Sequence, residues 1–155
     1  MALMRWFLIV ATGLVALASP SRAAQGRVIK VLPLYLDTNG QYTVSPSLYD
    51  RDAYQFFLQL HPSKRTGLRF LVNWTTLKTG SDPLKLQVEM RGVAEGKLPK
   101  QRVLEETVRR HGWFTQWTGL TLGGAEYKDF GEVTAWRARL WDGDKLLGEQ
   151  QSFLW

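Results

Sequence analysis

The chain has 155 residues, 20 lysines and arginines against 14 acidic residues, a formal net charge of +6, and no cysteine. This length fits one domain that can bury a substantial hydrophobic core. The lack of cysteine excludes thiol catalysis, cysteine-ligated metals and a disulfide framework, and the excess of positive charge is small for a nucleic-acid binder.

Residues 1–23 have the three-part layout of a secretory signal peptide. Arg5 provides a short basic start, residues 6–17 form an apolar stretch, and small residues follow up to Ala23. The apolar stretch is shorter than the roughly 20 residues of a membrane-spanning helix, which favours a cleaved leader over a retained anchor. We expect cleavage after Ala23, with residues 16–18 as the second-ranked site, and therefore a protein exported to the periplasm or secreted.

Most of residues 24–155 alternate between apolar and polar side chains, the pattern of strands with one buried face. The first such segment contains Pro33, which has no N–H for a sheet ladder, so we expect this strand at a sheet edge or bent. Alternation and turn spacing predict about seven strands, at residues 27–37, 68–78, 84–91, 102–110, 113–122, 132–141 and 145–155.

One segment departs from the alternation. Residues 51–60 carry apolar side chains at helical spacing, with Asp50 placed as an N-cap and Pro62 as a stop. We therefore expect one short helix inserted at residues 51–60 that covers an open end of the sheets. The apolar set that would pack there comprises Ala53, Phe56, Phe57 and Leu60.

The strand count, the polar turns and the lack of a linker or repeat predict an all-β fold. We expect a single domain over residues 24–155, an antiparallel two-sheet β-sandwich of about seven strands with the inserted helix.

Residues 127–153 resemble the closing strand pair of immunoglobulin-like and fibronectin type III-like sandwiches. The sequence Asp129-Phe130-Gly131 stands where that family turns into its penultimate strand, and Asp142-Gly143-Asp144 stands at the final hairpin. Val133 replaces a tyrosine of the family and Ala135 replaces its strand cysteine. The resemblance implies an architecture and no activity.

The closing hairpin sorts its side chains onto two faces, with residues 142–144 as a three-residue loop. The core-facing set comprises Trp136, Ala138, Leu140, Leu146, Gly148 and Leu154. The opposite set comprises Arg137, Arg139, Trp141, Leu147 and Phe153, with Arg137 across from Glu149. A slip of one residue would exchange the faces of the second strand and leave those of the first unchanged. Because arginine stems can lie beside an indole ring, Arg137, Arg139 and Trp141 are candidate partner-binding residues.

Trp113 and Trp117 point the same way along their strand, roughly 13 Å apart. This spacing could present two aromatic platforms to an extended ligand, so both are candidate ligand-binding residues. The favoured alternative is that this face packs against the other sheet, because aromatic side chains supply much of the buried area of a core. Phe114, Leu120 and Leu122 would then lie on the opposite face.

The other candidates for chemistry lack the arrangement that chemistry needs. His61 and His111 are the only histidines and no catalytic or metal-binding motif accompanies them. The carboxylate pairs have ordinary uses as a helix cap, as turn residues or on opposite sides of a strand, and too few ligands are visible for calcium. We expect no catalytic residue, no metal and no cofactor.

We therefore expect an exported, non-catalytic sandwich that serves as an interaction or structural module, through exposed sheet edges or the face of Arg137, Arg139 and Trp141. The alternative is a carbohydrate-binding module that uses Trp113, Trp117 or Trp141 as a platform. Loss of the leader lowers the formal charge from +6 to +4, which favours an envelope protein or an envelope polysaccharide as partner and not a nucleic acid. No membrane span would remain after cleavage.

Overall fold

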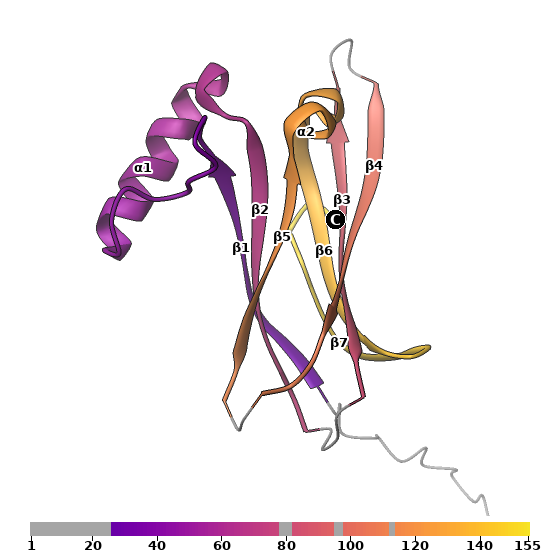
Figure 1. Cartoon of the computed structure of the whole chain (residues 1–155). Coiled ribbons are helices and arrows are strands. Elements are labelled where there is room, and N and C mark those ends of the chain that lie inside the picture. The colour runs from indigo at the N-terminus through magenta and orange to yellow at the C-terminus, as the bar shows by residue number, and fades with distance from the viewer. Residues whose placement is uncertain (1–25, 78–81, 95–97, 112–113) are drawn as a thin grey trace, which may run out of the picture.

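The chain folds into two antiparallel sheets that face each other as layers (Figure 1). The computed structural model describes residues 26–77, 82–94, 98–111 and 114–155, so the expected leader lies outside them. One sheet has the order β1-β2-β5, and the other has the order β4-β3-β6-β7. The strands are β1 (Gly26–Leu36), β2 (Gly67–Thr76), β3 (Leu84–Val93), β4 (Pro99–Val108), β5 (Gln116–Gly123), β6 (Glu132–Asp142) and β7 (Lys145–Gln151). The expected all-β sandwich is confirmed.

The inner faces of the two sheets share one hydrophobic core. Every second residue of β2 and β3 points into it, as the alternation predicts. Trp74 is the largest fully buried side chain, and its Nε1–H donates to Oγ1 of Thr118 on β5 at 2.9 Å. The core includes Phe70, Val72 and Trp74 of β2, Leu86, Val88 and Met90 of β3, and Ala138 and Leu140 of β6.

β1 is an edge strand of the three-stranded sheet, as Pro33 predicts. Its first residues lie against β7 of the other sheet. A Cβ on Gly148 would lie 2.8 Å from the Cα of Arg27, so glycine permits a close approach that a side chain would block. The seam between the sheets is therefore tightly closed at this end of β1.

The helix inserted after β1, α1 (Leu48–Leu60), begins earlier than expected and shows a different face to the sheet. Ser47 is the N-cap and accepts a bond from the N–H of Asp50, so Asp50 is not the cap. Only Leu58 of this helix is buried. The expected packing of the apolar set is therefore wrong: Phe56, Phe57 and Leu60 are exposed.

Polar contacts to β1 and to the segment after it explain why α1 directs its polar side chains, and not its apolar set, toward the sheet. The side chain of Gln55 pairs with the backbone of Tyr35, and the hydroxyl of Tyr54 donates to Asp37 at 2.7 Å. These contacts hold α1 beside β1, at the flank of the three-stranded sheet (Figure 1). Hydrophobic periodicity alone cannot reveal them, because it ranks faces only by their apolar content.

A second helix, α2 (Gly124–Phe130), stands where the sequence predicts only a turn. It links β5 of one sheet to β6 of the other and places Phe130 in the core. A short 3-10 helix, η1 (Pro62–Lys64), follows α1. Neither α-helix of the described residues has the length and apolar content to cross a lipid bilayer.

The register of the closing hairpin differs from the predicted one. Asp142 pairs with Lys145, so the loop has two residues, and a bulge lies between Leu140 and Trp141. The bulge turns Leu147 into the core, at 1% exposure, while Leu146 is 43% exposed. The predicted faces of these two leucines are therefore exchanged.

Two further details of the hairpin prediction are corrected. β7 ends at Gln151, so Phe153 and Leu154 belong to no strand and both are exposed. Arg139, not Arg137, lies across from Glu149, because Arg137 pairs with Gln151. The sorting of β6 itself is confirmed: Ala138 and Leu140 are buried, and Trp136 packs partly buried against the core.

Candidate functional site

β6 contributes to two surfaces, one on its outer face and one along its edge. Its outer face carries Arg137, Arg139 and Trp141 at every second position, next to Glu89 and Arg91 of β3. We call the cluster of Glu89, Arg91, Arg137, Arg139 and Trp155 the arginine face. The edge of β6 borders a groove described below.

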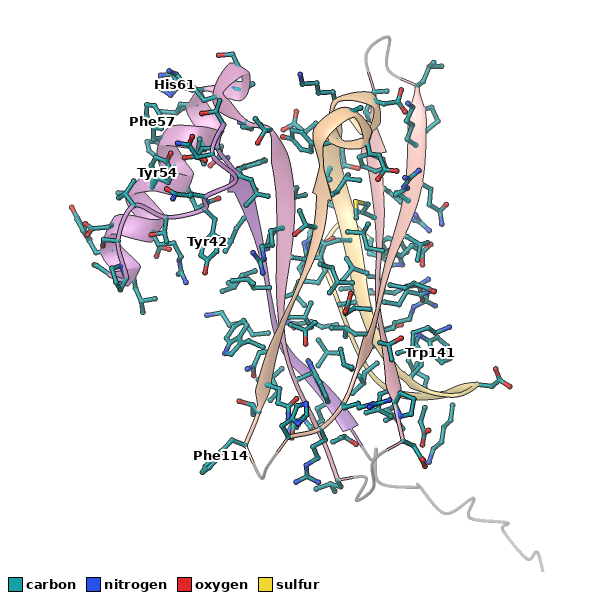
Figure 2. The ribbon with its side chains drawn as sticks, in the orientation of Figure 1. Tyr42, Tyr54, Phe57, His61, Phe114 and Trp141 are labelled. Carbon is teal, nitrogen blue, oxygen red and sulfur yellow. The ribbon has the colours of Figure 1, made fainter. Side chains whose placement is uncertain are left out.

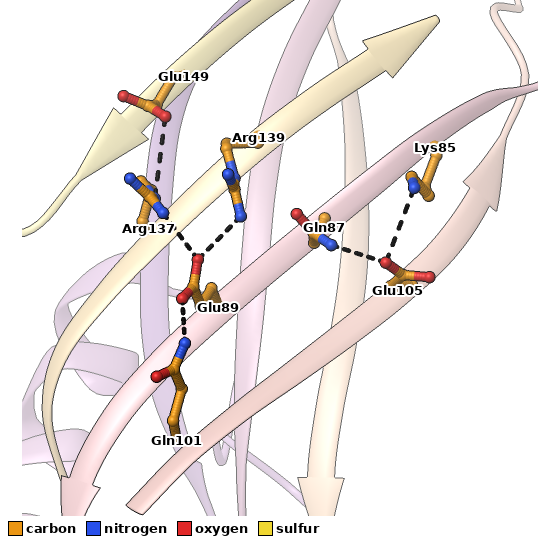
Figure 3. A network of polar contacts seen from close by, with 8 residues as sticks. All are labelled: Lys85, Gln87, Glu89, Gln101, Glu105, Arg137, Arg139 and Glu149. Atoms are coloured by element: carbon orange, nitrogen blue, oxygen red, sulfur yellow. Dashed lines mark hydrogen bonds and ion pairs between the residues drawn. The ribbon is translucent and has the colours of Figure 1, made fainter. Parts of the chain in front are cut away.

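Glu89 is the centre of the arginine face (Figure 3). Its Oε2 accepts bonds from Nη2 of Arg137 at 2.9 Å and from Nη2 of Arg139 at 2.8 Å, and its Oε1 accepts from Gln101. Burial by itself would raise the pKa of Glu89, whose residue is only 6% exposed, but the bond from Arg137 and the positive charges of Arg137, Arg139 and Arg91 hold the pKa below its ordinary value. The neighbouring arginines thus favour the charged form of the carboxylate.

Trp155 lies on the same face. Its ring has the guanidinium of Arg91 4.0 Å from its centroid and that of Arg137 4.5 Å from it. The guanidinium of Arg139 lies 5.4 Å from the ring of Trp141. Cation–π contacts of this kind stabilise both partners when water is partly excluded. The aromatic residues at the end of the chain therefore build an outer surface as well as a core.

The structure therefore brings Arg137, Arg139 and Trp141 together as predicted, but the positive charges of the two arginines already face acidic side chains. Both arginines bond to Glu89, and Arg137 also lies 3.9 Å from Glu149. The sequence places Glu89 and Arg91 on one polar strand face, yet nothing in it indicates that this face adjoins β6 or that Trp155 covers it. The arrangement is that of a stabilising network with little positive charge left for a ligand.

A groove opens at the seam between the sheets, where β1 and β6 separate. It has a volume of about 550 Å³ and lies between the second half of β1 and α1 on one side and the first residues of β6 with Ser152 on the other. We call it the seam groove. Its lining residues include Leu32, Pro33 and Tyr35 of β1, Gln55 and Phe56 of α1, and Val133, Thr134 and Trp136 of β6.

The two strand edges that border the seam groove differ chemically. On β1, Gln55 fills the edge: the N–H of Tyr35 donates to Oε1 of Gln55 at 2.7 Å, and Nε2 of Gln55 donates to the carbonyl oxygens of Tyr35 at 3.0 Å and Tyr42 at 2.8 Å. The amide side chain thus takes the place of a neighbouring strand. On β6, residues 132–135 pair only with β3 among the described strands, because β7 pairs with β6 no further than Arg137.

Replacing Gln55 with alanine should lower the free energy of unfolding by about 1–3 kcal/mol, because it leaves the amide and carbonyl of Tyr35 without their partner. Denaturant titration measures this change. Gln59→Ala on the same helix is the matched control, since the Gln59 side chain is exposed at the groove rim, and it should change stability by less than about 0.5 kcal/mol. Equal losses in the two variants would contradict the role given to Gln55.

The predicted aromatic platforms lie elsewhere. Trp117 is 52% exposed on the outer face of the three-stranded sheet, so the expected packing of this residue against the other sheet is wrong. Trp113 lies outside the described residues. Phe114 is also exposed, at the end of the molecule opposite α2 (Figure 2), whereas Leu120 and Leu122 are buried. The structure therefore does not bring Trp117 near the arginine face, which belongs to the other sheet.

The histidines and carboxylates form no metal-binding cluster in the part of the chain that the structure describes: no group of three or more histidine, aspartate or glutamate side chains there could hold a metal ion. His61 stacks on Phe57 with ring centroids 4.3 Å apart, and its Nδ1 lies 2.8 Å from the Phe57 carbonyl oxygen. This position at the end of α1 is structural.

No protein-family model, curated protein or solved structure matches this chain. The geometry of the seam groove and the two outer faces is therefore the basis for the function proposed below.

Proposed function

We propose that this chain is an exported, non-catalytic interaction module that holds a partner protein of the cell envelope in the seam groove. The observation that supports the proposal is the combination, in one groove, of an apolar strip and a short strand edge that has no second neighbour among the described strands. An uncovered strand edge is a template with which another chain can pair. Export rests on the leader at residues 1–23.

The seam groove suits this role better than the arginine face does. A binding surface needs hydrogen-bonding groups and apolar area that are free in the unbound protein. Glu89 accepts a bond from each of its two arginines, and the Nε atoms that these bonds leave without a partner are buried. In the groove, Phe56 is 62% exposed, and Glu132–Thr134 of β6 have no second neighbouring strand among the described strands.

We further propose that the sandwich is of the immunoglobulin-like and fibronectin type III-like class. β1, β2 and β5 share one sheet, and β3, β6 and β7 share the other, as strands A, B and E and strands C, F and G do in immunoglobulin domains. β4 pairs with β3, as the additional C′ strand does in variable-type domains. Membership of this class would imply an architecture and no particular activity, so the binding role rests on the seam groove alone.

A photoreactive phenylalanine analogue, benzoylphenylalanine, in place of Phe56 should give one dominant cross-linked envelope protein in the producing cells. The same analogue in place of Phe114 is the control, because Phe114 is 85% exposed but lies far from the seam groove, at the opposite end of the molecule (Figure 2). Mass spectrometry of the adducts is the measurement. Identical adducts from the two positions, or none from Phe56, would remove the groove as a binding site.

A carbohydrate-binding role is the second candidate, and the exposure of Trp117 favours it. A half-exposed indole on a sheet face can stack on a sugar ring. Titration of soluble envelope glycans, followed by tryptophan emission, separates the two functions. The protein-partner proposal expects no spectral change across the panel. A shift that disappears in Trp117→Ala would instead establish the carbohydrate site.

A further inference from the structure

The ladder between β6 and β7 stops before β6 does. Ser152, just after β7, makes the last contacts: its N–H donates to the carbonyl oxygen of Trp136 at 2.8 Å, and its Oγ accepts from the N–H of Trp136 at 3.0 Å. β6 begins four residues earlier, at Glu132, and β3 is the only strand beside Glu132–Ala135 in the described chain. Ala135 is 3% exposed, and a bulge leaves Thr134 without a partner in β3. The accessible edge along the seam groove is therefore Glu132–Thr134, which has no second neighbouring strand among the described residues.

The segment that could continue β7 into this position turns away from it. After Ser152 the chain bends, and the N–H of Trp155 donates to the carbonyl oxygen of Ser152 at 3.2 Å. The ring of Trp155 then lies against Arg91 and Arg137 on the outer face of the sheet. These contacts hold the chain away from the edge of β6.

The opposite wall of the groove cannot accept a strand in the same way. Pro33 has no N–H to donate, and the N–H and carbonyl of Tyr35 are already bonded to Gln55. A polypeptide in the groove would therefore find more open backbone groups on β6 than on β1. Leu32, Pro33 and Phe56 form an apolar strip on this second wall, and Arg51, Asp52 and Gln59 of α1 border it with polar groups.

We propose that the seam groove binds an extended segment of a partner protein as an additional antiparallel or parallel strand along Glu132–Thr134 of β6, the accessible part of this edge. Three residues of β6 span about 10 Å, which fixes the length of the paired core of that segment. Because side chains alternate along a strand, every second residue of the segment faces Trp136 and Phe56 and is apolar. Main-chain bonds supply affinity and the apolar positions supply selectivity, as in other cases of strand addition.

This inference rests on the proposed function and names the kind of partner that the groove accepts. The probe is a phage-displayed library of random twelve-residue peptides, selected on the whole protein. Peptides that bind should carry apolar residues at alternate positions. Phe56→Ser should weaken the best peptide at least tenfold, while the matched Phe114→Ser should change its affinity less than twofold.

Methylation of the peptide nitrogens tests the backbone pairing directly. Only alternate N–H groups of an added strand point toward β6. Methylating those residues one at a time should weaken binding at least tenfold, and methylating the residues between them should change it less than twofold. Amide exchange at Thr134, the residue of Glu132–Thr134 that has no partner in β3, should also slow at least tenfold in the bound protein.

Three results would overturn the inference. They are the lack of any peptide that binds the native protein better than it binds the Phe56→Ser variant, equal effects of methylation at both sets of alternate peptide positions, and dimerisation of the protein through the groove as its concentration rises. If another envelope protein is cross-linked at Phe56 but one of these results is obtained, the proposed function stands and the partner binds by a folded surface. A lack of any cross-link would instead remove the proposed function itself.

Discussion

Replacing Trp74 with alanine should lower the free energy of unfolding by about 3–5 kcal/mol, a large share of the stability of a domain of this size. Trp74 is 1% exposed on the inner face of β2, so the change opens a cavity between the sheets. It also leaves the hydroxyl of Thr118 without the indole N–H bonded to it at 2.9 Å. The midpoint of thermal unfolding should fall by roughly 10–20 °C.

Trp117→Ala is the matched control for this variant. Trp117 lies on the neighbouring strand, paired with Asn73, but points to the outer face. Its removal should cost less than about 1 kcal/mol, because a half-exposed ring forfeits little buried area. Calorimetry or denaturant titration of both variants makes the comparison. Comparable losses would mean that the inner and outer faces of β2 and β5 are wrongly assigned.

Replacing Glu89 with alanine should lower the free energy of unfolding by about 2–4 kcal/mol. The change removes the acceptor that Arg137, Arg139 and Gln101 share and leaves the two guanidinium groups close together, with only Glu149 at 3.9 Å from Arg137 as a counter-charge. Both arginine side chains keep some exposure, 26% and 19%, which holds the cost below that of a fully buried pair. Glu105→Ala is the control, since its pair with Lys85 is half exposed and is worth about 0–1 kcal/mol.

The effect of Glu89→Ala should depend on pH in a defined direction. The pKa of Glu89 lies below its ordinary value of 4.5 in the folded protein. Its contribution is therefore fully present above pH 4.5 and is lost as the pH falls through the lowered pKa. The stability difference between the native protein and the variant should be constant from pH 6 to 7 and shrink below pH 4.5. A difference that grows on acidification would contradict this assignment.

Period-2 alternation was sufficient to predict the strands and most of the core. β3 shows why: Leu84, Leu86, Val88 and Met90 are all buried, in the order that the sequence implies. The bulge opposite Leu140 was not predictable, because Leu146 and Leu147 are equally apolar and either could face the core. The two-residue loop and the bulge together place Leu147, and not Leu146, in the core.

The candidate site was predicted only in part. The sequence placed Arg137, Arg139 and Trp141 on one face, but it did not show that Glu89 neutralises the arginines, because that pairing depends on β3 lying beside β6. The seam groove was not predicted at all. It depends on where β7 stops and on a glutamine side chain that bonds to a strand 20 residues away, and neither leaves a periodic signal. The exposed side of α1 was misassigned for the same reason.

The bonds between Gln55 and Tyr35 also determine how an added strand could change the sandwich. A strand that bonded to both β1 and β6 would join the two sheets into one continuous sheet along the seam. Because the backbone of Tyr35 is already bonded and Pro33 has no N–H, such a strand could bond to β6 alone. It would widen the four-stranded sheet and leave the two layers separate.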